Sequence, residues 1–143
     1  MERETMHPAY FETQFRTPEL VEDWPQEFVI VTAYATTGTQ WSSEQNAAAD
    51  RRLEAELRER GGGRVRVTGF SPTTGHAEPG WAFEMPFEEA CDLGMRYLQD
   101  ALYHVWGDVL SVSHCDERRK RIEVGGFRER LHPRAFGFDS QVR

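Results

Sequence analysis

Runs and alternations of apolar residues along the chain predict five strands. The clearest strand is residues 28–34, which are apolar on both faces and β-branched in the middle, as is typical of a central strand. Residues 64–70 and 81–85 alternate with a period of two, so each of these strands has one face suited to a core. Residues 109–115 and 121–124 predict a hairpin that ends this region.

Two helices are predicted between these strands. Ser42 with Gln45 three residues later is a capping-box pattern, which predicts a helix from about residue 43 to residue 60 that stops at the glycines 61–63. A second helix is expected to begin at residue 87 and to close at Gly107. Its core-facing stripe is Phe87, Ala90, Cys91, Gly94, Leu98, Ala101, Leu102 and Val105.

The order of these elements predicts the fold class. A β-α-β-β-α-β order is that of the ferredoxin-like plan, so we expect an α+β, two-layer sandwich with an extra C-terminal strand. At 143 residues the chain is expected to form a single domain over residues 1–143. Within it we expect a core at about 10–124 and an Arg/Phe-rich C-terminal tail at 125–143.

The predicted first strand needs cover on both of its faces. A two-layer sandwich covers only one face of a sheet with helices. Tyr10, Phe11 and Phe15 are the nearest supply of apolar area, and we expect them to pack over the second face. Pairing of two copies through that face is the alternative, so the protein is expected to be a monomer or a homodimer.

Charge and hydropathy restrict the partners. The chain has 24 acidic and 17 basic residues and a net charge of -7, which makes nucleic acid an unlikely partner, because phosphate contacts need basic side chains. The arginine-rich segments 118–121 and 128–134 are the exception to this balance. The chain has no apolar run of membrane-spanning length and no signal-peptide pattern at its amino end. We therefore expect no membrane association and a cytoplasmic protein.

The chain carries no recognised cofactor or catalytic motif. Phosphate-binding loops, serine-hydrolase elbows and zinc-protease motifs are all missing from the sequence, so we expect no cofactor. His76 and Glu78 could supply two metal ligands, with His104 or His114 as a third, but this spacing is sparse for zinc and no metal is expected. Cys115 next to His114 does not make a dyad, because neighbours on a strand point to opposite faces.

Chain topology suggests where a ligand site would lie. In the predicted fold the loop 35–41, the start of the first helix and the turn 71–80 share one end of the sheet. The carboxyl end of the second helix, predicted at His104 and Trp106, lies there too. We expect a pocket at this end, where a helix amino terminus also favours negative charge. The candidate ligand-binding residues are Thr36, Asn46, His76, Glu78 and Gln99.

Each candidate also has a structural interpretation. The amide of Asn46 suits a hydrogen bond that ties the start of the first helix to the preceding loop, and Gln99 invites the same two interpretations. Glu78 suits a cap on that helix as well as a ligand contact. Residue type alone leaves both interpretations open.

Five short strings together resemble a known family. They are residues 9–13, 32–34, 43–46, 76–81 and 98–101, in the family's order. This set is similar to a bacterial family catalogued as domain of unknown function 3293, over roughly residues 10–124. The resemblance implies no activity.

The chain departs from the pattern of this family at two places. Where such sequences have Thr-Ala-Trp-Asn-Pro, residues 32–36 are Thr-Ala-Tyr-Ala-Thr, which loses an amide and a proline. Leu98 stands before Gln99 where a glycine is usual. If the missing amide belongs to a site, that site is altered in this chain.

Three functional hypotheses follow. The first is a small cytoplasmic binding or accessory domain for a small polar ligand or a protein partner. The alternative is a small hydrolase or transferase that uses Glu78 with His76 or Asn46, and the second alternative is nucleic-acid association through the Arg-rich hairpin and tail. An enzyme should hold Glu78 in a cleft beside a donor, whereas a nucleic-acid binder should gather its arginines on one face.

Overall fold

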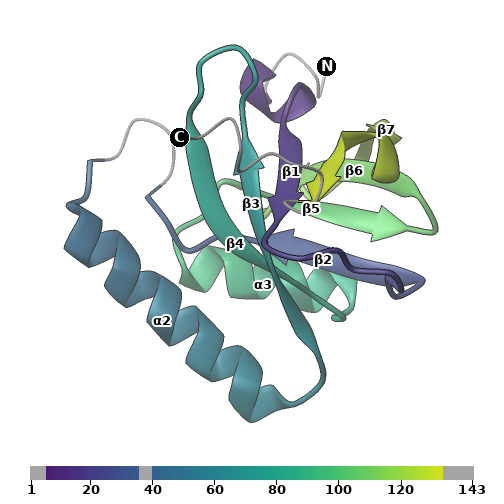
Figure 1. Ribbon diagram of the computed structural model, residues 1–143. Coiled ribbons are helices and arrows are strands. Elements are labelled where there is room, and N and C mark those ends of the chain that lie inside the picture. Colours follow the sequence, from purple (N-terminus) through teal and green to yellow (C-terminus); the bar gives the residue numbers. More distant parts are fainter. Residues whose placement is uncertain (1–5, 36–39, 134–143) are drawn as a thin grey trace.

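The computed structural model describes residues 6–35 and 40–133 (Figure 1). The strands are β1 (Gln14–Thr17), β2 (Glu27–Val31), β3 (Arg64–Phe70), β4 (Ala77–Phe83), β5 (Ala101–Trp106), β6 (Val109–His114), β7 (Ile122–Gly126) and β8 (Leu131–Pro133). The α-helices are α2 (Ser43–Arg60) and α3 (Phe87–Arg96), and the short 3-10 helices are η1 (Pro8–Phe11) and η2 (Arg128–Arg130). Neither α-helix is long and apolar enough to cross a membrane.

All eight strands belong to one mixed sheet, in the order β7-β6-β5-β2-β4-β3-β1-β8. Neighbouring strands pair antiparallel, apart from β1 and β8, which pair parallel. The sheet curls like a half-barrel, so that β3 and β4 cross β5 and β6 steeply in Figure 1. The ring centroids of Phe15 on β1 and Tyr103 on β5 lie 5.1 Å apart, although β3, β4 and β2 separate these strands in the sheet. The curl brings the two strands face to face.

The predicted two-layer, ferredoxin-like sandwich with one extra C-terminal strand is wrong. The sheet has eight strands, and its second face is covered by its own curl and by the amino-terminal segment. The reason lies in the central strand β2, whose Val29 and Val31 enter the core under the helices while Phe28 and Ile30 enter a second core on the concave side. A flat sheet with helices on one side would leave the second set of side chains in water.

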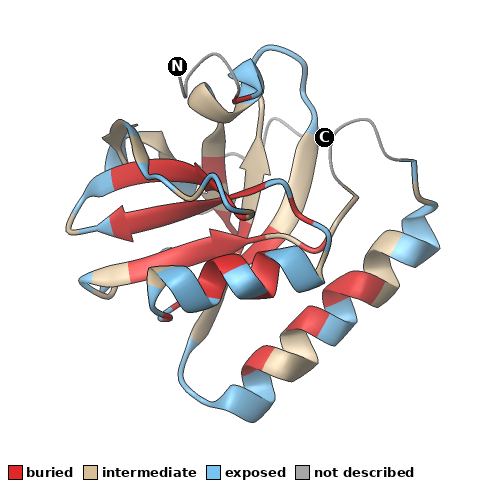
Figure 2. Cartoon of the chain, turned by 180° about the vertical axis from the view of Figure 1, so that it is seen from behind, coloured by how far each residue is buried: buried red, intermediate tan, exposed pale blue. Residues whose placement is uncertain are grey.

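The convex face of the sheet packs against α2 and α3. Figure 2 shows buried residues on the inner side of both helices and exposed residues on the outer side. A charged cluster reinforces this contact, because Asp50 of α2 binds Arg66 of β3 through two oxygens at 2.7 and 2.9 Å. Trp81 Nε1 donates to Asp50 at 3.2 Å, and the Arg66 guanidinium lies 4.0 Å from the centre of the Trp81 ring. The buried carboxylate is therefore fully paired.

Aromatic side chains fill the concave face. Phe15, Phe28 and Phe127 are each 1% exposed, and the Phe127 ring lies within 6 Å of both other rings. Tyr10 and Phe11 pack against the same core while remaining half-buried. The prediction that the amino-terminal aromatic residues cover the second face is confirmed. Phe127 adds to this cover from the segment 125–133, part of the predicted tail.

The second helix is shorter than predicted. It ends at Arg96, and residues 101–106 form β5. Leu98 takes a positive φ of 61°, and the N–H groups of Leu98 and Gln99 donate to the carbonyls of Met95 and Gly94 at 3.0 and 2.9 Å. This pair of bonds is the Schellman motif that ends many helices. The last residues of the predicted helical stripe, Ala101, Leu102 and Val105, belong instead to β5, a strand buried on both faces.

The start of α2 agrees with the sequence prediction. Ser42 Oγ accepts from the Gln45 N–H at 3.0 Å, and Gln45 Oε1 accepts from the Ser42 N–H at 2.8 Å. The helix ends at Arg60, and Gly61 follows as its C-cap with a φ of 88°, which suits glycine. Both ends of this helix therefore follow from local sequence signals.

The substitution Ser42→Ala should lower the free energy of unfolding by about 1 kcal/mol, because the Gln45 N–H loses its partner. Urea unfolding followed by circular dichroism measures the effect. Ser43→Ala, one position into the helix, is the matched control and should change stability by less than about 0.5 kcal/mol. Equal losses in the two variants would show that Ser42 is not the cap.

Candidate functional site

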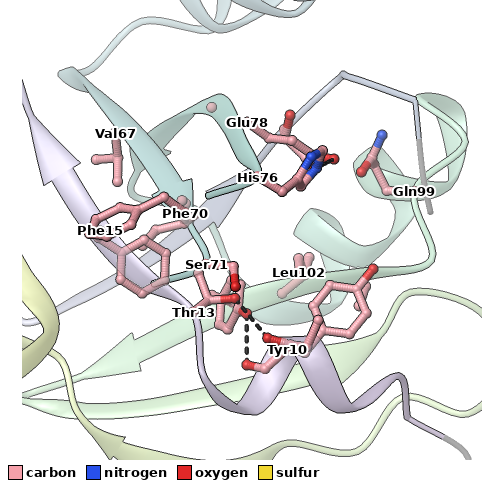
Figure 3. Close-up of a pocket in the computed structure, with 17 residues that line it drawn as sticks. Tyr10, Thr13, Phe15, Val67, Phe70, Ser71, His76, Glu78, Gln99 and Leu102 are labelled. Atoms are coloured by element: carbon pink, nitrogen blue, oxygen red, sulfur yellow. Dashed lines mark hydrogen bonds and ion pairs between the residues drawn. The ribbon is translucent and has the colours of Figure 1, made fainter. Parts of the chain in front are cut away.

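A small cavity lies on the concave side of the sheet, where η1 closes over the ends of β3, β4 and β5 (Figure 3). Its volume is about 120 Å³. The strands bring their ends together because β3 finishes where β4 begins and β2 finishes near the start of β5, as the antiparallel registers show. Segments from residue 9 to residue 103 therefore meet around one space.

The cavity has one apolar side and one polar side. Its apolar surface comes from Phe15, Ile30, Val67, Phe70, Ala101 and Leu102. In Figure 3, Phe15, Val67 and Phe70 lie on one side, while Glu78, His76 and Gln99 lie on the other. A molecule that fills this space would meet hydrocarbon at one end and hydrogen-bonding groups at the other.

A wider basin of about 660 Å³ adjoins the cavity. Ala9, Ser71, His76 and Glu78 line both spaces, so they form the boundary between them. The outer part of the basin is lined by residues that include Asn46 and three aromatic or acidic side chains, Glu12, Tyr34 and Trp41. The two spaces together make a mouth and an inner chamber.

His76 and Glu78 form a pair at this boundary. His76 Nε2 lies 2.9 Å from Glu78 Oε2, and the His76 side chain is 71% exposed while that of Glu78 is 25% exposed. Glu78 lies on β4 opposite Gly69 of β3, and both residues line the cavity. A Cβ atom at Gly80, two residues further on, would lie 2.7 Å from the Val31 carbonyl oxygen. A glycine there lets β4 approach β2.

The orientation of the Gln99 amide follows from its neighbours. Gln99 Nε2 donates to the carbonyl oxygens of Tyr34 at 2.7 Å and Tyr97 at 3.1 Å. Both partners are acceptors, so the NH₂ group must face them and Oε1 must point the other way. Figure 3 draws this oxygen on the side of His76. Gln99 is 9% exposed, and no described residue hydrogen bonds to its Oε1.

Two tyrosines complete the polar side. The Tyr103 hydroxyl donates to the Tyr10 carbonyl at 2.8 Å, which fastens η1 over the cavity. Burial raises the pKa of the Tyr10 hydroxyl above its ordinary value, and the negative charges of Asp100 and Glu78 raise it further. No partner among the described residues hydrogen bonds to this hydroxyl. The Tyr10 hydroxyl is therefore protonated at physiological pH.

The structure brings together most of the predicted site residues. Asn46, His76 and Glu78 line the basin, and His76, Glu78 and Gln99 line the cavity. Asn46 Oδ1 accepts from the Ala35 N–H at 2.8 Å, so this oxygen ties the start of α2 to the preceding loop. Thr36 lies outside the described residues. Participation of the other four in ligand binding stays a prediction.

Two residues expected at this end of the sheet lie elsewhere. His104 and Trp106 were placed at the end of a helix, but both belong to β5. His104 Nε2 lies 2.7 Å from Glu27 Oε2 and its ring meets Phe87, so it does not join His76 and Glu78. In the part of the chain that the structure describes, no three His, Cys, Asp or Glu side chains form a potential metal site.

The arginine-rich segments are engaged in intramolecular contacts. Arg119 binds Glu88 at 2.9 Å and Asp92 at 2.7 Å, which fastens the β6–β7 hairpin to α3. Arg118 binds Asp116 at 2.8 Å. Arg130 donates to three backbone carbonyls, those of Phe11, Thr13 and Val124.

Sequence analysis missed several residues of the site. Tyr10 was proposed only as cover, and Thr13, Thr32, Ser71 and Tyr103 were not considered, although all five line the cavity. A usable signal was present, because each of the five strings that carry the family resemblance contributes at least one lining residue. These residues are Ala9, Tyr10, Glu12 and Thr13; Thr32 and Tyr34; Asn46; His76, Glu78 and Gly80; and Gln99 and Ala101.

The substitution Leu98→Gly should raise the free energy of unfolding by roughly 0.5–1 kcal/mol. Leu98 has a φ of 61°, where a Cβ atom is unfavourable, and its side chain is 66% exposed and contributes little burial. The greater freedom of glycine in the unfolded chain offsets part of the gain. Leu98→Ala keeps the Cβ atom and should bring no gain. Urea unfolding that ranks the alanine variant above the glycine variant would contradict this explanation.

Comparison with known proteins identifies a family. The family model described as protein of unknown function (DUF3293) matches residues 31–102, half of the chain. Neither the curated proteins nor the solved structures gave a match. The matched segment runs from the end of β2 to the start of β5 and includes Asn46, His76, Glu78 and Gln99. The chain belongs to the DUF3293 family, as its sequence motifs predicted.

Proposed function

We propose that this protein is a binding domain that holds a small ligand in the inner cavity, with the basin as its entrance. The observation that carries the proposal is the Gln99 amide. It is 9% exposed, is held in one orientation by two carbonyls, and has no described partner for its Oε1. No buried side-chain oxygen of the described residues lacks a partner, so Gln99 Oε1 is in contact with solvent in the cavity, and a ligand that donates a hydrogen bond can replace that solvent.

The size and lining of the cavity support the same proposal. A cavity of about 120 Å³ is comparable with the engineered apolar cavity of ~150 Å³ that admits benzene, so a ligand of about six heavy atoms fits. The Tyr10 hydroxyl and the Glu78 carboxylate supply further contacts on the polar side. Water could hydrogen bond to the Tyr10 hydroxyl and the Glu78 carboxylate. The apolar surface of Phe15 and Val67, however, is stabilised by contact with the hydrocarbon part of a ligand and not by contact with water.

Hydrolase or transferase chemistry is the second candidate, favoured by one observation. The contact between His76 Nε2 and Glu78 Oε2 at 2.9 Å is an imidazole held by a carboxylate at the mouth of a cavity, a geometry that suits proton transfer. No described Ser, Thr or Cys side chain hydrogen bonds to the His76 ring or to the Glu78 carboxylate, since Thr74 Oγ1 accepts only from the His76 backbone N–H, and Ser71 Oγ accepts from two backbone N–H groups of its own turn. Binding therefore has more support than nucleophilic catalysis.

Nucleic-acid association has the least support. Arg118 of the hairpin binds Asp116 and Arg119 binds Glu88 and Asp92, so the charge of these two arginines is neutralised within the chain. Arg130 is directed inward to backbone carbonyls. The net charge of -7 also disfavours binding to the phosphates of a nucleic acid.

A thermal-shift screen against a library of small metabolites tests the proposal. A ligand at about 100 times its Kd should raise the free energy of unfolding by about 2.7 kcal/mol and raise the melting temperature. Ala101→Leu should abolish that shift, because it adds three carbon atoms to the wall of the cavity. Ala55→Leu on α2, outside both spaces, should keep the shift.

The controls separate the possible outcomes. A compound that stabilises the wild type and the Ala55→Leu variant but not the Ala101→Leu variant would support binding in the cavity. A library without any stabilising compound, or stabilisation that survives Ala101→Leu, would contradict the proposal. Mass spectrometry of each stabilising compound after incubation tests the second candidate, since an enzyme would convert it, and His76→Gln would slow the conversion.

A further inference from the structure

The donors and acceptors around the inner cavity are unequally available. The hydroxyls of Thr13, Thr32 and Tyr103 donate to the carbonyls of Ala9, Pro79 and Tyr10, at 3.0, 2.8 and 2.8 Å respectively. Their protons are therefore already used within the protein. Both N–H groups of the Gln99 amide are committed as well. What Gln99 offers to a ligand is an acceptor, Oε1.

Carboxylates outnumber permanent cations around the cavity and basin. Among the described residues that line either space, Glu78 and Glu12 are acidic, none is Lys or Arg, and His7 and His76 are the only side chains that could become cationic. Glu78 Oε2 contacts His76, while no described residue hydrogen bonds to Glu78 Oε1. The raised pKa of Tyr10, caused by burial and then by Asp100 and Glu78, agrees with a negative potential on this side.

Aromatic rings surround the same space. Tyr10, Phe15 and Tyr103 line the cavity, and the Tyr103 ring lies edge-on to the other two rings, with centroids 6.3 and 5.1 Å away. Aromatic faces attract cations and do not attract anions. A carboxylate ligand would lie beside Glu78 and Gln99 Oε1, and although the Tyr10 hydroxyl could donate to it, no Lys or Arg among the described lining residues would compensate its charge.

From these observations we infer that the ligand class of the cavity is a small aliphatic or aromatic amine in its ammonium form. This inference rests on the proposed binding function. The ammonium group donates to Glu78 and to Gln99 Oε1, and the hydrocarbon part lies against Phe15, Ile30 and Val67. Two of the three ammonium protons match acceptors that the described residues leave open, Glu78 Oε1 and Gln99 Oε1, and the small chamber limits the tail to about five carbons.

Three probes test the inference: 3-methylbutylammonium, 3-methylbutan-1-ol and 3-methylbutanoate. They share one branched five-carbon skeleton and differ in the polar group at its end. At pH 8 the amine is protonated, because simple alkyl amines titrate near ~10.4 as lysine does. Titrations followed by NMR should give Kd values about tenfold lower for the ammonium than for the alcohol, since a charge-assisted hydrogen bond is stronger than a neutral one. The carboxylate should bind most weakly.

Matched variants locate the preference. Glu78→Gln keeps the shape of the side chain and should reduce the ammonium preference over the alcohol from about tenfold to about twofold or less. Glu123→Gln, on the exposed part of β7, makes the same change in net charge and should keep the preference. Circular dichroism checks that both variants fold. If Glu78→Gln does not fold, the order of the three Kd values on the wild-type protein still tests the ligand class.

Each outcome has a definite meaning. The ammonium binding first, with its preference lost in Glu78→Gln and kept in Glu123→Gln, supports the inference. Equal or tighter binding of the alcohol or carboxylate, a preference that survives Glu78→Gln, or no binding of any probe overturns it. The proposed binding function stands in these cases if a metabolite still stabilises the wild type and not Ala101→Leu, so failure of the ligand class and failure of the function are distinguishable.

Discussion

Burial of the central strands on both faces is the constraint on which the rest of this structure depends. Val29 and Val31 of β2 point into the core under the helices, and Phe28 and Ile30 point into the concave core. Two helices can cover one face only. The other face becomes dry because the sheet curls until β1 meets β5, and because Phe15 and Phe127 fill the space inside. The strand order and the amino-terminal cover both serve this requirement.

The cavity is a consequence of the same curl. A curved sheet closes on itself imperfectly at the end where strands finish, and here η1 closes the opening through the bond from Tyr103 to the Tyr10 carbonyl. The Schellman motif at Leu98 then ends α3 and delivers Gln99 to the rim. The positive φ of Leu98 explains why a glycine suits this position. Helix termination and site geometry are therefore linked through two adjacent residues.

Local signals in the sequence predicted some of these features and not others. Ser42, Gln45 and Gly61 define α2 because capping depends on residues that are close in the chain. The strand at residues 101–106 was missed because a strand buried on both faces lacks alternation, and its apolar residues happened to continue the helical stripe of α3. The grouping of Asn46, His76 and Glu78 could be predicted, since it requires only the direction of the strands. The position of Tyr10 in the lining of the cavity could not be predicted, because it depends on the curl of the sheet.

The most direct test of the central claim is to locate a bound ligand by NMR, using a compound that stabilises the protein. We predict the largest chemical-shift changes at the Gln99 side-chain amide and at the backbone amides of Gly69 and Ala101, which surround the cavity. The exposed pair Trp106 and Val109 at the tip of the β5–β6 hairpin should not change. Changes centred on the hairpin tip, with none at Gln99, would contradict the claim that the curled sheet forms a ligand site.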